Sequence, residues 1–165
     1  MTQKTLARWL SAGLLVVAVA RPGDAAGAAH TEALLLSCMD YRLTDDITRY
    51  MDWRGLHDDY DHVILAGASL GAQTRKHRAW GKTFWEHLDV ALQLHHVRKV
   101  VLLDHRDCGA YKVFLGEDLA KDAAHETSVH ARYLRELRRQ ILAKHPDLAV
   151  EMGIMALDGS VEPVK

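Results

Sequence analysis

Residues 100–109, VVLLDHRDCG, form the stretch around which the chain is organised. Their first part is an apolar run without alternation, which is typical of a strand buried on both faces of a parallel sheet. The run ends at charged residues and at Gly109, where a helix can begin. His105 and Cys108 would therefore lie at the carboxyl edge of the sheet, where open α/β folds bind their ligands.

The length and composition indicate one folded domain. The chain has 165 residues, of which 48% are hydrophobic, enough for a substantial core. The formal net charge is −1, so nothing in the charge balance indicates binding to nucleic acid or to an anionic surface.

The N-terminus has the layout of a secretory signal peptide. Basic residues precede an apolar stretch over 10–20, and Ala-Gly-Ala at 26–28 provides a cleavage site, with a second at 18–20. The apolar stretch is short for a membrane span, and an uncleaved anchor is the alternative. We expect residues 1–28 to be a signal peptide, residues 29–165 to be the folded domain, and the protein to be exported, either periplasmic or secreted.

Apolar runs alternate with segments of helical spacing along the rest of the chain. The runs predict strands at residues 33–38, 62–66, 99–104 and 149–157. The helical spacing predicts one helix that ends near 53 and others over about 82–95, 110–115 and 123–144. Strands that alternate with helices form right-handed βαβ units. We therefore expect an α/β fold with a mostly parallel central sheet of about four strands and helices on both faces.

Both cysteines come where an apolar run gives way to charged residues. Cys38 ends the first predicted strand, and Cys108 stands three residues after His105. Adjacent parallel strands would bring the three side chains together. Two thiolates and an imidazole suit zinc, and three protein ligands leave a position open, as catalytic zinc sites do. A structural Cys38–Cys108 disulfide is the alternative, since an exported protein can form one.

Asp40 and Arg42 follow Cys38 closely enough to act at the same site. An Asp–Arg pair keeps the carboxylate ionised and fixes its orientation. The carboxylate could then accept a hydrogen bond from a zinc-bound water. These two residues are the catalytic candidates of the sequence.

Taken together, the motifs resemble those of the β-class carbonic anhydrases. The resemblance covers residues from about 34 to 158 and rests on a C-x-D-x-R run at 38–42 and an H-x-x-C-G run at 105–109. It implies a β-carbonic anhydrase-like fold and the activity of a carbonate dehydratase, a zinc lyase. That activity is the reversible hydration of carbon dioxide to bicarbonate, with zinc-bound hydroxide as the nucleophile.

The same resemblance implies a role for each candidate residue. Cys38, His105 and Cys108 would hold Zn²⁺. Asp40, paired with Arg42, would act as a gate. Released from Arg42, Asp40 can become the fourth zinc ligand in a closed, inactive form.

Several positions depart from the family pattern. Tyr41 stands where the family commonly has serine, Asp104 where it has glycine, and Arg106 where it has a small residue. Residues 64–68 read ILAGA and lack the polar groups that the family usually has there. Two alternatives therefore stay open: a zinc hydrolase of carbonyl sulfide or carbon disulfide, and a non-catalytic zinc-binding domain of the same fold.

The expected partners follow from these interpretations. The substrate is a small molecule, carbon dioxide or bicarbonate, and we expect no nucleic acid and no membrane contact after signal cleavage. The resemblance implies a homodimer or higher homo-oligomer. The family's N-terminal arm, however, has almost no room before Leu34.

Overall fold

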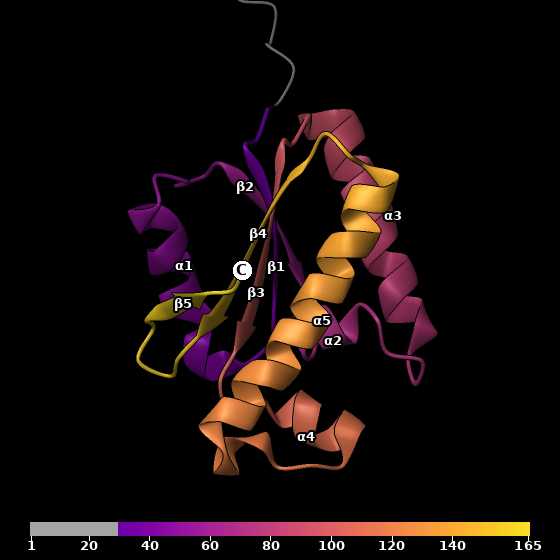
Figure 1. Cartoon of the computed structure of the whole chain (residues 1–165). Helices are drawn as coiled ribbons and strands as arrows, with labels where there is room; N and C mark the ends of the chain where they lie inside the picture. The colour runs from indigo at the N-terminus through magenta and orange to yellow at the C-terminus, as the bar shows by residue number, and fades with distance from the viewer. Residues whose placement is uncertain (1–29) are drawn as a thin grey trace, which may run out of the picture.

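One sheet forms the centre of the molecule, with its strands in the order β2-β1-β3-β4-β5 (Figure 1). The computed structural model describes residues 30–165. The strands are β1 (Ala33–Ser37), β2 (Tyr60–Ile64), β3 (Lys99–His105), β4 (Ala149–Met155) and β5 (Val161–Pro163). The first four are parallel, whereas β5 is antiparallel to β4. The predicted α/β class with a mostly parallel sheet is confirmed.

Helices cover both faces of this sheet, as Figure 1 shows. The helices are α1 (Thr44–Trp53), α2 (Ala68–Gly71), α3 (Arg78–His95), α4 (Gly109–Leu115) and α5 (Ala123–Lys144). Two short 3-10 turns, η1 (Tyr41–Leu43) and η2 (Leu119–Lys121), precede α1 and α5. Helix α1 packs on one face and helices α3 and α5 pack on the other, while α4 follows the carboxyl end of β3.

The buried strands explain why the central sequence runs are continuously apolar. Leu36 of β1 belongs to the core cluster that contains Leu134 of α5, whereas its neighbour Leu35 packs with Met51 of α1. All four side chains are fully buried. Successive residues of a strand point to opposite faces, so a strand covered on both sides needs apolar residues at every position.

Within residues 30–165 the sheet has five strands, where about four were expected. Strand β5 has three residues, of which one is Pro163, and it follows a turn at Gly159, where φ is +84°. Such a segment is too short to show alternation in the sequence. It was missed because its pairing with β4 depends on the turn and not on a hydrophobic pattern.

The predicted boundaries of the helices and strands agree with the structure less closely than their predicted types do. The helix predicted over 123–144 is confirmed as α5, but β2 begins and ends two residues earlier than predicted, at Tyr60 and Ile64. Helix α3 starts at Arg78, ahead of the predicted residue 82, and the short helix α2 was not predicted.

The expected signal peptide over 1–28 lies outside the described residues. Among the helices of residues 30–165, none combines the length and the apolar character that a membrane crossing requires.

Candidate metal centre

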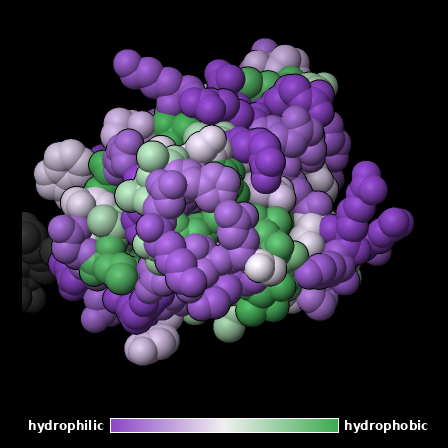
Figure 2. All heavy atoms as spheres, turned by 60° about the horizontal axis from the view of Figure 1, so that its bottom comes forward, coloured by the Kyte–Doolittle hydropathy of each residue, from purple (hydrophilic) through white to green (hydrophobic). Residues whose placement is uncertain are grey.

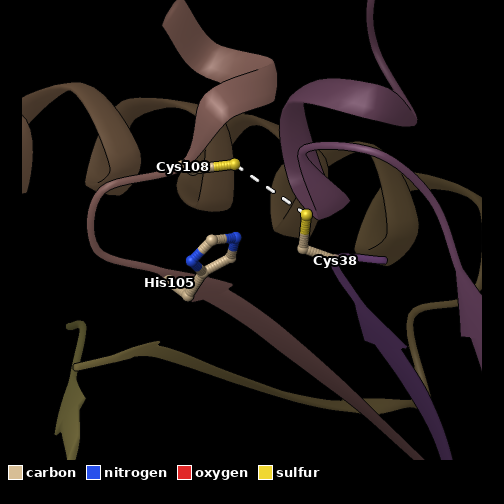
Figure 3. A group of neighbouring side chains, drawn as sticks. All are labelled: Cys38, His105 and Cys108. Atoms are coloured by element: carbon tan, nitrogen blue, oxygen red, sulfur yellow. Dashed lines mark hydrogen bonds between the residues drawn. The ribbon is translucent and has the colours of Figure 1, made fainter. Parts of the chain in front are cut away.

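The carboxyl ends of β1 and β3 lie side by side, because Ser37 is the register partner of Leu103. Cys38 follows β1 directly, His105 is the last residue of β3, and Cys108 is the N-cap residue of α4. Figure 3 shows the three side chains converging from these elements. Their ligand atoms all lie within 4.8 Å of one another. The structure thus brings together the three ligands that the sequence predicts.

The two sulfur atoms have a separation that suits a shared metal ion. Cys38 Sγ and Cys108 Sγ lie 3.8 Å apart, both cysteines are free, and both are buried. Two thiolates bound at about 2.3 Å to one tetrahedral zinc ion lie about 3.8 Å apart. The pair therefore fits zinc without rearrangement, and the disulfide is not the state described here.

His105 presents one nitrogen to the same space. Its Nδ1 lies 2.8 Å from the carbonyl oxygen of Arg106, which can only accept, so Nδ1 carries the hydrogen. Its Nε2 is buried and has no hydrogen-bond partner among the described residues. An imidazole anchored through one nitrogen and free at the other is the usual arrangement of a metal-ligating histidine.

The cysteine pair is polarised toward a thiolate at Cys38. The hydrogen bond from Cys108 lowers the pKa of Cys38, and His105 and the backbone N–H of Gly67 lower it further, against the effect of burial. The Gly67 nitrogen lies 3.2 Å from Cys38 Sγ. The same sulfur–sulfur hydrogen bond and burial raise the pKa of Cys108. A cation bound between the sulfurs would compensate the second negative charge.

Asp40 and Arg42 lie beside the three ligands. Arg42 binds Asp40 through two parallel hydrogen bonds, from Nε to Oδ1 at 2.9 Å and from a terminal nitrogen to Oδ2 at 2.8 Å. These bonds hold the pKa of Asp40 below its ordinary value, so the carboxyl is ionised at neutral pH. Asp40 Oδ2 is 3.8 Å from His105 Nε2. The carboxylate therefore borders the space into which the ligand atoms point.

Arg42 is itself held by a residue next to the ligands. One of its nitrogens donates to Asp107 Oδ2 at 2.8 Å and another to the Asp107 carbonyl at 3.0 Å. Asp107 has a φ of +52°, in the left-handed region. The buried carboxylate of Glu126, on α5, accepts from the Asp107 N–H at 2.7 Å. Arg42 and Glu126 thus stabilise this backbone conformation between His105 and Cys108.

A cavity of about 600 Å³ opens beside Cys38, Asp40 and Arg42. Its wall is largely apolar and includes Ala66 and Phe114. Figure 2 looks onto the carboxyl end of the sheet, where apolar patches interrupt a hydrophilic surface. Three large apolar side chains at the mouth are exposed: Met39 (67%), Tyr41 (86%) and Val113 (70%).

Two groups near the centre were missed in the sequence: the N–H of Gly67 and the carboxylate of Glu126. The glycine turn was recognised, but a backbone donor leaves no sequence signal. Glu126 did leave one, because it stands three residues before Val129 on the buried stripe of α5. A carboxylate on an apolar helix face indicates that it has a buried partner.

Sequence comparison finds a family and two close relatives. Residues 28–142 match the model of a family described as "Putative carbonic anhydrase". An uncharacterized protein of Rickettsia conorii is 41% identical over 135 residues, which cover 82% of this chain and 73% of that protein. An uncharacterized protein of Rickettsia bellii is 40% identical over 135 residues, 82% of each chain.

Solved structures share the fold at low identity. A carbonic anhydrase from Glaciozyma antarctica superimposes with a TM-score of 0.53 and 18% identity, covering 87% of this chain and 89% of that one. The β-carbonic anhydrase isoform I of Trichomonas vaginalis gives 0.52 and 15%, covering 84% of each.

Proposed function

Since the chain belongs to the family described as "Putative carbonic anhydrase" and has the fold of the β-class enzymes, we propose that it is a zinc enzyme that reversibly hydrates carbon dioxide to bicarbonate. The observation that carries this proposal is the buried cluster of Cys38, His105 and Cys108 beside an Asp40 that Arg42 keeps ionised. A zinc ion held by these three residues would supply the Lewis acidity that activates water near neutral pH.

Asp40 and Arg42 do different work in this proposal. Asp40 would accept a hydrogen bond from a water in this site and orient it, since its Oδ2 borders the space shared with His105 Nε2. Arg42 keeps that carboxylate charged and aimed, while Asp107 anchors Arg42. Carbon dioxide, which is apolar, would enter along the apolar wall of the adjoining cavity.

The Asp40–Arg42 pair also supports the gating role. In this structure Arg42 binds both carboxylate oxygens of Asp40, as the proposed open form would require. Asp107 holds Arg42 independently, so Arg42 would stay in place if Asp40 turned to become a fourth metal ligand. The closed form would require Asp40 to rotate and to give up its hydrogen bonds to the Arg42 guanidinium and to the Arg42 backbone N–H.

Zinc analysis and stopped-flow hydration on one sample test the proposal. We expect about one zinc per chain in protein purified under reducing conditions, and carbon dioxide hydration that rises from pH 6.5 to pH 9. Cys108→Ser should lose most of the zinc and the activity together. Asp118→Asn, which alters a partly exposed carboxylate in the loop after α4, is the control and should retain both. Zinc without hydration would contradict the proposal.

A second candidate is a zinc hydrolase of carbonyl sulfide or carbon disulfide. The apolar side chains around the mouth favour it, because the sulfur analogues are larger and more polarisable than carbon dioxide and gain more from contact with an apolar wall. The same purified sample, assayed for release of hydrogen sulfide, separates the two candidates. Zinc with neither activity would leave a metal-binding domain without catalysis.

We also propose that a second copy of the chain packs against the apolar rim of the mouth. Met39, Tyr41 and Val113 expose apolar surface next to the centre, and such patches commonly mark interfaces. Light scattering after size exclusion should give a homodimer or higher homo-oligomer. Tyr41→Arg should shift that state toward the monomer.

The location outside the cytoplasm also belongs to the proposal. It rests on the composition of residues 1–28 alone. Mass spectrometry of exported protein should find a mature N-terminus after residue 28. Recovery of the uncleaved chain from the membrane fraction would instead indicate an anchor.

A further inference from the structure

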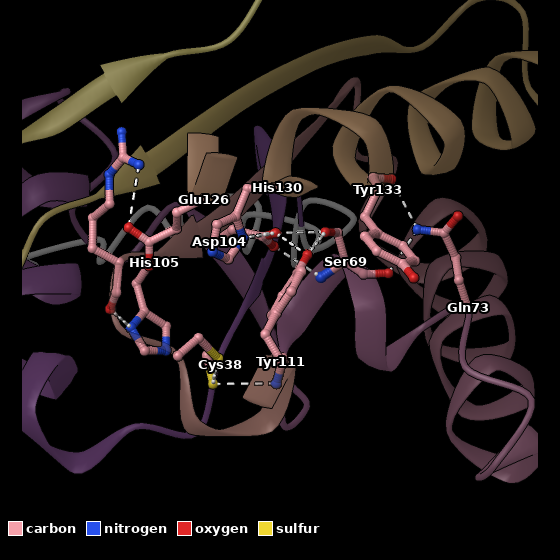
Figure 4. A network of polar contacts seen from close by, with 12 residues as sticks. Cys38, Ser69, Gln73, Asp104, His105, Tyr111, Glu126, His130 and Tyr133 are labelled. Atoms are coloured by element: carbon pink, nitrogen blue, oxygen red, sulfur yellow. Dashed lines mark hydrogen bonds and ion pairs between the residues drawn. The ribbon is translucent and has the colours of Figure 1, made fainter. Parts of the chain in front are cut away.

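Asp104, the residue before the predicted ligand His105, accepts four hydrogen bonds in the protein interior (Figure 4). Its Oδ1 accepts from the Ser69 backbone N–H at 3.0 Å. Its Oδ2 accepts from Ser69 Oγ at 2.7 Å, from the Tyr111 hydroxyl at 2.6 Å and from His130 Nδ1 at 2.9 Å. Asp104 is 1% exposed, and its three partners are no more exposed than that. A buried carboxylate bound this completely has little freedom to move.

The donors come from the elements that carry the metal centre. Tyr111 lies one helical turn after Cys108 on α4. Ser69 belongs to α2, two residues after Gly67, whose N–H donates to Cys38 Sγ. The carboxylate therefore connects, through single side chains, the segments that position both sulfur atoms and the histidine.

His130 extends the same connection to α5. It lies four residues after Glu126, one turn along the helix, and Glu126 holds the backbone between the ligands through the Asp107 N–H. Two buried groups of α5 thus contact the segment that carries His105 and Cys108, one at Asp104 and the other at Asp107.

The arrangement requires a carboxylate and not merely a polar side chain. Burial raises the pKa of Tyr111 well above its ordinary value, so its hydroxyl keeps its hydrogen. The backbone N–H of Ser69 cannot accept. An amide at position 104 would have only one acceptor oxygen and would turn an N–H₂ group toward one of these donors. One donor would then be left buried without a partner, and its element would have to shift.

We infer that Asp104 is a positioning residue of the metal centre, which fixes α4 and the Gly67 turn relative to His105. The inference rests on the proposed zinc site and deepens it. Asp104 touches neither the ligand atoms nor the cavity, and it acts through Tyr111 and Ser69.

Metal affinity and a cobalt spectrum distinguish this role from a purely structural one. In Asp104→Asn, we expect zinc binding about 10- to 100-fold weaker in competition with a chelating dye. Cobalt(II) replaces spectroscopically silent zinc as the probe, and we expect its absorption bands to change in position and intensity. Tyr111→Phe, which removes one donor and keeps the carboxylate, should weaken zinc binding less, by up to about 10-fold.

Ile141→Ala is the matched control for loss of stability. Ile141 is fully buried in the last turns of α5, at the far end of that helix from Glu126. It should lower the melting temperature and leave zinc affinity and the cobalt spectrum unchanged. If Asp104→Asn also lowers only the melting temperature, the inference is wrong. If Asp104→Asn does not fold, Tyr111→Phe decides: unchanged affinity and an unchanged spectrum would overturn the inference.

Failure of the inference and failure of the proposed function give different results. Wild-type protein that binds zinc or cobalt but hydrates no carbon dioxide contradicts the proposed function and leaves the Asp104 test intact. Wild-type protein that hydrates carbon dioxide, together with an Asp104→Asn variant of unchanged metal affinity and spectrum, contradicts the inference alone.

Discussion

At the scale of single residues, two aspartates near the same ligands have opposite surroundings. Asp40 lies near the surface, where a guanidinium holds it through two charge-assisted hydrogen bonds. Asp104 is fully buried and is held by hydroxyl, imidazole and backbone donors. The first keeps room to change partners next to the reacting space, whereas the second has none. This difference is the physical basis for proposing Asp40 as a participant and Asp104 as a support.

The substitution Asp40→Asn separates metal binding from turnover. The change keeps the size of the side chain but removes its negative charge and one acceptor oxygen. We expect zinc content to stay near one per chain, while turnover falls by about 10- to 100-fold, the usual effect of losing a group that orients what a metal binds. Stopped-flow hydration and elemental analysis on one sample give both values. Unchanged turnover would disprove the role of Asp40.

The clustering of Cys38, His105 and Cys108 could be predicted from the sequence because these residues stand where strands end. Cys38 and His105 each close an apolar run, and the carboxyl ends of parallel strands meet at one edge. Ser69 and Glu126 could not be predicted in the same way. Their contacts with Asp104 and Asp107 are set by how α2 and α5 pack on the sheet, and one sequence does not contain that information.

At the scale of helices and strands, the strength of the apolar pattern in the sequence decided which elements could be predicted. Helix α5 has 22 residues, a regular apolar stripe and a capping side chain, Asp122, that accepts from two backbone N–H groups. Both ends of this helix were predicted correctly from the sequence. Helix α2 has four residues, too few for any period. The bounds of β2 follow its pairing with β1, where Tyr60 is opposite Ala33, more closely than its own hydrophobicity.

Helix α2 also gives a prediction about close packing. A Cβ at Gly71 would overlap the carbonyl oxygen of Ala66, in the turn that leads to Gly67. Backbone atoms cannot give way cheaply, so Gly71→Ala should lower the free energy of unfolding by about 1–3 kcal/mol or more. Gly109→Ala is the control, because its Cβ would meet nothing within 4 Å and its φ is not positive. Urea unfolding measures both, and equal stability of the two variants would contradict the packing argument.

At the scale of the whole molecule, the candidate metal centre joins elements that are distant in sequence. Cys38 and Cys108 are 70 residues apart, yet their sulfurs lie within 3.8 Å. Such a site is not formed in the unfolded chain, so metal binding adds directly to folding stability. With free zinc at about 100 times its dissociation constant, the added stability is about 2.7 kcal/mol.

Removal of the metal should therefore lower the melting temperature. For a domain of this size, about 2.7 kcal/mol corresponds to a shift of about 5–10 °C. Calorimetry of protein treated with a zinc chelator, under reducing conditions, measures the shift, and added zinc should restore it. Cys108→Ser is the control, because its melting temperature should no longer respond to zinc. Equal responses of the variant and the parent would place the zinc elsewhere.

Two histidines, one in β2 and one in the loop before it, should change the pH dependence of folding stability in opposite directions. Burial lowers the pKa of His62, whose Nε2 lies 2.7 Å from Ser37 Oγ. Below the ordinary pKa of about 6.5, the unfolded chain binds a proton at His62 more readily than the folded chain does. His62 therefore lowers stability as the pH falls from about 7.5 to about 5.5.

His57 responds in the opposite sense. The hydrogen bond to Asp52, with the nearby Asp58 carboxylate, raises the pKa of His57, so the folded chain binds its proton first. His57 contributes stability at low pH that is lost as pH rises through its folded pKa. The effect is small, because the pair is exposed to solvent.

Urea unfolding at about pH 7.5 and about pH 5.5 tests the pair of histidines together. Relative to the parent chain, His62→Gln should lose less stability on acidification, and His57→Gln should lose slightly more. The metal ligands are the same in all three proteins, so their own pH dependence cancels in the comparison. The change in the free energy of unfolding between the two pH values is the quantity compared. If both variants altered this change in the same direction, the opposite environments of the two imidazoles could not explain the pH dependence. Shifts of opposite sign would show that strand β2, at the edge of the sheet, keeps His62 neutral as part of folding.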